Sequence, residues 1–239
     1  MRRGKTSILI SLGVLLIFIL TIGAFSFSAK NPQEKANELQ FDNIIKKVSS
    51  FFKSNKDKLE INKGDVIAEV NGIPIYKNEF ELRKGLALAS GVQADNIDDY
   101  ILQKLIREKV QEYLASKYNI RVSEGEINEY IEKEKKEFNE YPEAKKKLDE
   151  LINASGMTED EYWNTYERYN AKRILLFNKL YDFIIKEGIK SGELKKAEQM
   201  TADVQNEYKK YFDSIVDKYI KTAKISINNE YKTMFKGFW

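Results

Sequence analysis

The sequence predicts a mainly α-helical protein, a multi-helix bundle or cradle with one small antiparallel sheet, preceded by an N-terminal membrane segment. Three observations lead to this prediction. Apolar residues recur at intervals of three and four over most of the chain, which is the spacing of a helix face. Residues 66–76 instead alternate around Asn71-Gly72, the dipeptide most favoured in two-residue hairpins. Residues 7–27 form an almost unbroken apolar run.

Residues 1–28 are expected to be a signal peptide or a transmembrane anchor. Basic residues at positions 2, 3 and 5 precede the apolar run, which has the length of an anchor because about 20 apolar residues span a bilayer. Ala24-Phe25-Ser26 is the alternative, since its small-x-small pattern suits a cleavage site. Both alternatives place the rest of the chain outside the cytoplasm, anchored to the cell membrane or secreted if cleaved.

The remaining chain divides into a linker with an amphipathic helix, residues 29–64, and a domain over residues 65–239. The amphipathic helix is expected at 34–58. Further helices are predicted at 78–89, 97–117, 127–138, 143–152, 159–187 and 194–221. Ser123 and Thr158 each precede a Glu by three residues, and such capping boxes start helices. Gly188 and Gly192 are expected to flank a hinge, and charged runs such as 132–137 to be solvated helix faces.

The hairpin at 66–76 gives the sheet its register. Pairing across the turn sets Val70 opposite Ile73 and Ala68 opposite Ile75, on one apolar face with Val66. The other face then carries Ile67, Glu69, Pro74 and Tyr76. Pro74 has no N–H to donate, so its strand should be the outer edge. The segment Ala223–Ile227 is therefore expected to pair with the 66–70 strand and close the domain.

The composition excludes several kinds of chemistry. The chain has no Cys and no His, so thiol catalysis, disulfides and His-based acid–base or metal sites are excluded. Its 40 basic against 37 acidic residues leave a surplus of three, which the basic residues at positions 2–5 supply. A nucleic-acid binder normally carries a basic stripe, so no nucleic-acid partner is expected. No cofactor or metal site and no enzymatic activity are predicted.

The order of motifs resembles that of a known family. VIAEVNGIPIYKNEF (Val66–Phe80) is followed by the apolar-basic run Leu102–Val110, the box VSEGEI (Val122–Ile127) and GMTEDEYW (Gly156–Trp163), which opens a long helix. This order is similar to the N-terminal chaperone domain of SurA- and PrsA-type foldases, whose helical fold is related to that of trigger factor. The resemblance covers about residues 66–187, with 204–227 as the closing helix and strand. It implies a chaperone domain that binds unfolded or exported polypeptides.

The chain departs from this family in two places. Tyr76 stands where relatives carry a Ser or Thr cap. Full-length relatives also insert a parvulin-type isomerase domain before the closing helix, and only residues 188–201 are available here. This segment is far too short for a domain of roughly a hundred residues, and the isomerase site uses histidines, which this chain lacks. The resemblance therefore implies a chaperone domain without the isomerase.

Four aromatic residues are the candidate client-binding site: Tyr162, Trp163, Tyr166 and Tyr169. Aromatic side chains on a concave helical surface supply large contact area at low entropic cost. The alternative is that the four form a core stripe, as helical stripes usually do.

Two functions follow from the sequence. One is an ATP-independent extracytoplasmic holdase for unfolded polypeptides. The alternative is a membrane-tethered structural or interaction protein that binds one specific folded partner.

Overall fold

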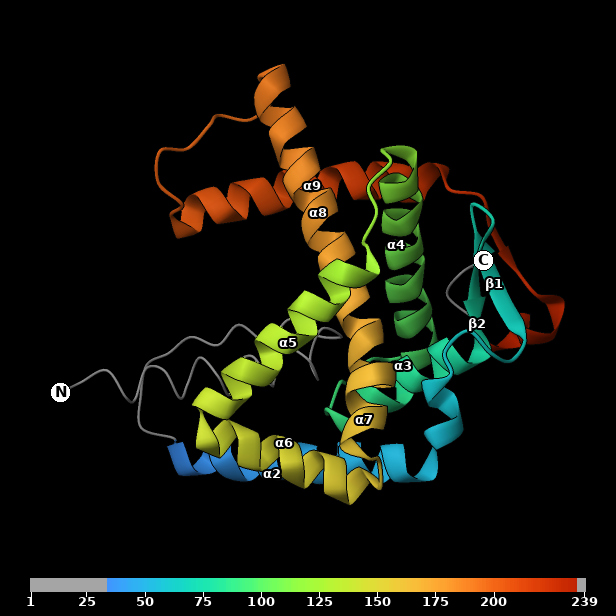
Figure 1. Cartoon of the computed structure of the whole chain (residues 1–239). Helices are drawn as coiled ribbons and strands as arrows, with labels where there is room; N and C mark the ends of the chain where they lie inside the picture. The colour runs from blue at the N-terminus through green and yellow to red at the C-terminus, as the bar shows by residue number, and fades with distance from the viewer. Residues whose placement is uncertain (1–33, 236–239) are drawn as a thin grey trace.

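The computed structural model describes residues 34–235, which are mainly helical, as predicted. Figure 1 shows α4 and α8 side by side as an upright stem, with α9 crossing them near the top. Helices α2 and α6 lie together at the base, and α5 slants between stem and base. These helices span Glu34–Ser54 (α2), Ile97–Lys117 (α4), Glu124–Glu140 (α5), Pro142–Ser155 (α6), Arg168–Ser191 (α8) and Ala202–Thr222 (α9).

The small sheet lies beside the stem and confirms the predicted topology (Figure 1). Strands β1 (Val66–Val70), β2 (Ile73–Tyr76) and β3 (Ile225–Ile227) are ordered β2-β1-β3, with both pairings antiparallel. The turn has φ of 51° at Asn71 and 81° at Gly72, as a type I′ turn requires. In the order β2-β1-β3, the strand that contains Pro74 is an edge strand, as predicted.

The prediction for Ile67 was wrong. We expected it on the polar face, but it is 1% exposed. The β1–β2 ladder is irregular between Val66 and Ala68, which breaks the strict alternation of faces. The Ile67 carbonyl also accepts a hydrogen bond of 2.9 Å from the Asn228 N–H, because the segment after β3 folds back beside the hairpin.

The C-terminal segment packs against the domain as far as the structure describes it. A 3₁₀ helix, η3 (Asn229–Met234), follows β3. Phe235 is fully buried, with its ring edge-on to Phe80 at 5.6 Å between centroids. The Tyr231 hydroxyl donates to Asp65 Oδ2 at 2.7 Å.

Helix boundaries follow local signals closely. Helix α3 (Lys77–Ala89) begins directly after the hairpin, and the 3₁₀ helix η1 (Lys56–Leu59) follows α2. Ser123 and Thr158 both form the predicted capping boxes. Gly156 and Gly192 end α6 and α8 in the left-handed conformation.

Three predictions about the long helices need correction. The helix from 159 consists of a short α7 (Glu159–Glu161), a π-helical turn, η2 (Tyr162–Glu167), and α8. Gly188 is no hinge, since α8 continues to Ser191. The Gly188 position instead lets α9 approach, because an added Cβ would lie 2.7 Å from the Tyr211 ring. Helix α9 begins at Ala202 rather than 194, capped by the Thr201 side chain.

The expected membrane segment, residues 1–28, lies outside the described residues. Within residues 34–235, no helix is long and apolar enough to cross a membrane.

Candidate polypeptide-binding face

Three of the four aromatic residues singled out in the sequence belong to the core. Tyr162, Trp163 and Tyr166 are 2%, 4% and 5% exposed. Tyr166 meets Phe52 of α2 edge-on at 4.9 Å, and Trp163 meets Phe138 of α5 at 6.2 Å. These contacts join η2 to the base and to α5, so the alternative of a core stripe describes these three residues.

Tyr169 is half-buried and belongs to an internal polar network. Its hydroxyl donates to Glu79 Oε1 at 3.0 Å, and Lys109 Nζ lies 3.1 Å from the same oxygen. Burial and the nearby Glu79 carboxylate raise the pKa of Tyr169. The Arg173 guanidinium lies over its ring at 5.3 Å. Tyr169 therefore helps to pack α3, α4 and α8 together.

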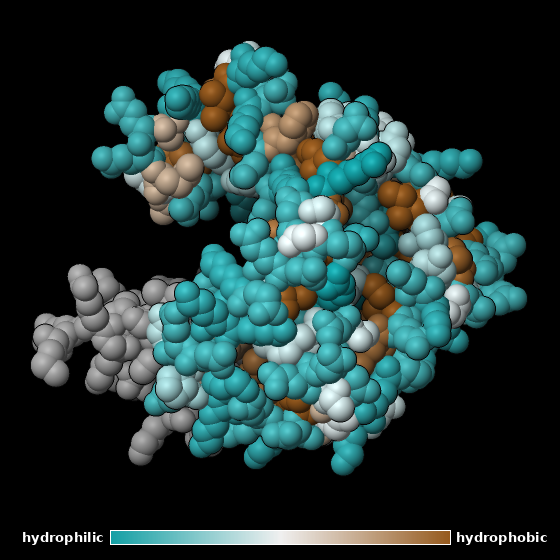
Figure 2. Space-filling model, viewed as in Figure 1, coloured by the Kyte–Doolittle hydropathy of each residue, from teal (hydrophilic) through white to brown (hydrophobic). Residues whose placement is uncertain are grey.

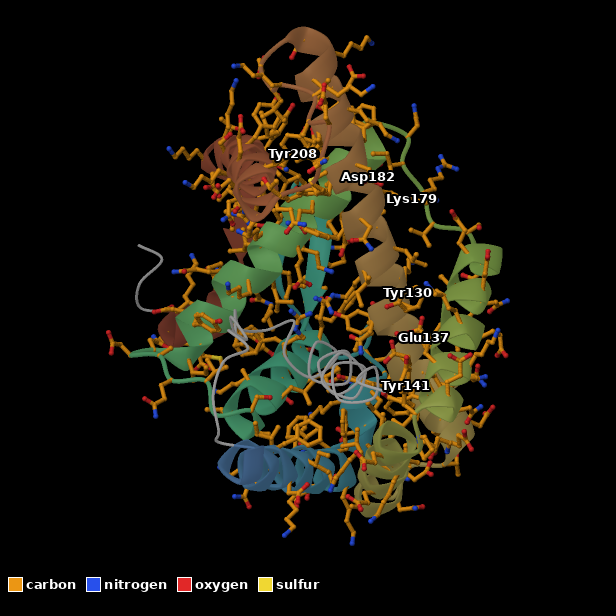
Figure 3. The ribbon with its side chains drawn as sticks, turned by 90° about the vertical axis from the view of Figure 1, so that its left-hand side faces the viewer. Tyr130, Glu137, Tyr141, Lys179, Asp182 and Tyr208 are labelled. Atoms are coloured by element: carbon orange, nitrogen blue, oxygen red, sulfur yellow. The ribbon has the colours of Figure 1, made fainter. Side chains whose placement is uncertain are left out.

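A candidate binding surface lies elsewhere, on a hollow beside the stem. Figure 2 shows that the surface is hollowed between the protruding end of α9 and the body below it. Figure 3 views this side directly, with α9, α8 and α5 around it. We call this surface the concave face, and the residues labelled on it are Tyr130, Glu137, Tyr141, Lys179, Asp182 and Tyr208.

The most exposed aromatic side chain of the described residues lies where α8 meets α9. Phe177 is 41% exposed and stacks on Tyr181 with 6.0 Å between ring centroids. Both rings rest on Phe212 of α9, at 5.3 and 5.2 Å. We call Phe177, Tyr181 and Phe212 the α8–α9 corner. A rigid aromatic pair on a buried third ring presents contact area at small entropic cost.

The corner is exposed because the apolar stripe of α8 is wider than the area that the neighbouring helices α4, α5 and α9 cover. Four consecutive apolar residues, Ile174 to Phe177, point around more than half of the helix. Arg173 contacts Glu108 of α4 and Leu180 is fully buried, whereas Ile174 and Leu176 stay half-exposed. The run of four apolar residues was the available signal that some of them had to remain outside.

The polar residues of the concave face are mostly engaged with their own fold. Lys179 pairs with Glu126 and donates to the Arg121 carbonyl at 2.8 Å, and this pairing lowers the pKa of Glu126 to about 2. The Tyr208 hydroxyl donates to the Lys195 carbonyl at 2.9 Å and accepts from the Ala197 N–H. These engaged polar groups, with Tyr130 and Tyr141 half-exposed, suit contact with varied partners better than recognition of one charge.

The described residues hold no group of three or more acidic side chains placed to bind a metal ion. The concave face and the adjoining α8–α9 corner together offer aromatic area, half-buried tyrosine and both signs of charge. That combination can bind polypeptide by contact.

Comparison with known proteins gives one match. A family model described as SurA-like N-terminal domain matches residues 1–171, which end in the first turn of α8. Searches of curated proteins and of solved structures found no match.

Proposed function

Because the chain belongs to the SurA-like N-terminal domain family, we propose that it is an ATP-independent holdase that binds unfolded or exported polypeptides on its concave face. In this proposal the chain has no isomerase activity. The family supports a chaperone-related role, and the holdase activity itself is our inference.

One observation carries the proposal. A hollowed surface and the exposed α8–α9 corner lie on the same pair of helices, with Phe177 41% exposed although it is aromatic. An unfolded segment exposes apolar side chains in no fixed order. A surface that holds such segments gains from several weak apolar contacts and from release, rather than from one deep pocket.

The proposed location is outside the cytoplasm. Residues 1–28 would anchor the chain to the membrane, or would be removed on export. A tether of this kind would hold the concave face where exported chains emerge in the unfolded state.

The test is suppression of aggregation by the full-length chain in detergent, with several chemically unrelated unfolded clients. We expect suppression without ATP, and we expect Phe177→Ser to weaken it. Leu88→Ser is the matched control, because Leu88 is 50% exposed on α3, away from the α8–α9 corner. Failure to protect any client would refute the holdase proposal.

The alternative function is binding of one specific folded partner, and one observation favours it. A shallow groove of about 820 Å³ runs between α2 and α3, lined by Phe51, Gly85, Leu88 and Ala89 with Lys46 and Lys47 among its polar residues. Under this alternative, Leu88→Ser should abolish a saturable one-to-one complex, and Phe177→Ser should leave it intact. The same two variants thus separate the two functions.

A further inference from the structure

Two carboxyl groups lie in the core where α5 meets the π-helical turn. Glu134 of α5 is 5% exposed and Glu167 of η2 is 1% exposed. Within residues 41–235, no cation forms an ion pair with either carboxyl, and no donor meets Glu134 Oε2 or the Glu167 oxygens with good hydrogen-bond geometry, although Tyr130, Tyr162 and Asn170 lie near them. An ionised carboxylate buried in this way is costly unless it is paired. A bound proton removes the charge and turns one carboxyl into a donor for the other.

The two helices place these groups together for different reasons. On α5, Glu134 occupies a core position in the stripe Ile127, Ile131, Glu134 and Phe138. Around η2, burial repeats every fourth residue: 162, 166 and 170, and likewise 163, 167 and 171. A π-helical turn has more than 3.6 residues and so sustains a repeat of four. The wider turn keeps Glu167 inside, facing α5.

The surroundings of the pair are nearly free of positive charge. The groups that act on it are Tyr130, Lys133 and Glu137 of α5, Tyr162 of η2 and Asn170 of α8. Burial raises the pKa of Glu134 to about 8, and burial and Glu134 raise the pKa of Glu167 well above its usual range.

The cations near this site pair with other carboxylates. Arg83 of α3 and Arg173 of α8 act on the neighbouring Tyr166, but both donate to Glu108. Lys133 is on α5 beside Glu134, and its closest carboxylate is that of Glu137, at 3.9 Å. The pair must therefore bind protons to remain buried.

We propose that Glu134 and Glu167 form a proton-operated latch: while they share protons, α5 is held against the base of α8, and when they ionise, α5 is released. The proposal goes beyond the holdase function and does not depend on it. Because α5 forms one side of the concave face, release of α5 would also change the width of that face (Figure 3).

The latch makes stability depend on pH with a definite sign. The folded protein keeps a proton on Glu134 up to about pH 8, whereas the unfolded chain releases it near 4.5. The folded state therefore binds more protons between these two values, and its stability falls as the pH rises through that window.

The test measures the distance between α5 and α8 in the full-length chain. The sequence has no cysteine, so Lys136→Cys and Lys172→Cys place one spin label on an exposed position of each helix. We expect a narrow distance distribution at pH 6 that broadens or shifts toward pH 10. The double variant Glu134→Gln/Glu167→Gln should keep the narrow distribution at both values.

The control is Glu140→Gln, which neutralises an exposed carboxylate at the end of the same helix and should leave the pH response unchanged. A distribution in the unsubstituted chain that is the same at pH 6 and pH 10 would overturn the latch. An equal pH response in the double variant would overturn it too, since some other group would then be responsible. If the double variant does not fold, Glu134→Gln alone replaces it, with the same expected loss of response.

Discussion

The ion pairs around Glu108 offer the sharpest test of how the stem is held together. Glu108 of α4 accepts two hydrogen bonds from Arg83 of α3, at 3.1 and 2.5 Å, and two from Arg173 of α8, at 3.0 and 2.7 Å. Arg83 is 3% exposed. One carboxylate therefore joins three helices, and Glu108→Gln would leave two guanidinium groups without their counter-charge.

The size of the effect follows from the pKa of Glu108. Burial alone would raise it, but the guanidinium groups of Arg173 and Arg83 lower it from 4.5 to about 2. A shift of that size corresponds to about 3 kcal/mol of stability at neutral pH. Because the pKa is lowered on folding, this contribution is present above pH 4.5 and is lost as the pH falls toward 2. At pH 3 about 1.5 kcal/mol should remain.

The assay is urea unfolding of the full-length chain at several pH values, followed by helical circular dichroism. Glu108→Gln should lower the free energy of unfolding by about 3 kcal/mol at pH 7 and by about half as much at pH 3. Asp217→Asn is the control, because Asp217 pairs with Arg107 at the surface and should matter by less than about 1 kcal/mol. A loss below about 1 kcal/mol at pH 7, or an equal loss at pH 3, would refute the reasoning.

Three further predictions concern two glycine sites and one helix cap, and the same unfolding assay measures them. Gly85→Ala would drive a methyl group into the Phe51 ring and should lower the free energy of unfolding by about 1–3 kcal/mol. Its control is Gly125→Ala, where the added methyl group meets no close neighbour and should be neutral or stabilising. Equal effects of the two variants would contradict the close approach of α2 to α3. Gly72→Ala should cost about 1 kcal/mol because φ is 81° there, and a neutral result would show that the turn can change type. Thr158→Ala should cost about 1 kcal/mol through loss of the capping box, and no loss would mean that the start of α7 is fixed by core packing alone.

The sheet could be predicted because its signals are local. The Asn71-Gly72 turn sets the register, and Pro74 marks the edge, so the remaining edge had to pair with the distant strand β3. The helix starts at Ser123 and Thr158 were predictable for the same reason, since a capping box needs only four residues.

What the sequence did not reveal depends on tertiary contacts. The irregularity that buries Ile67 arises where the C-terminal segment returns to β1. Glu134 lies within a charged run that predicts a solvated face, but it occupies a core position because α5 packs on η2. The π-helical turn that brings Glu167 inward has no accepted sequence signal.

The candidate site was predictable only as a class of surface. The sequence left two interpretations of the four aromatic residues, a binding surface or a core stripe, and the exposed aromatic ring on α8 is a different residue, Phe177. The residues differ, because α2 and α5 cover Tyr166 and Trp163, whereas Phe177 lies beside α9 and stays 41% exposed. Which part of a long apolar stripe is covered depends on how far neighbouring helices reach, and periodicity does not contain that information.

The central claim is that unfolded polypeptide binds the concave face, and site-specific photocrosslinking tests it most directly. A photoreactive phenylalanine would replace Phe177, Tyr130 or Leu88 in the full-length chain, which would then be illuminated with a permanently unfolded client. Crosslinks from positions 177 and 130, with none from position 88 in the α2–α3 groove, are the predicted result. Crosslinks from position 88 alone, or from none of the three positions, would contradict the assignment of the concave face.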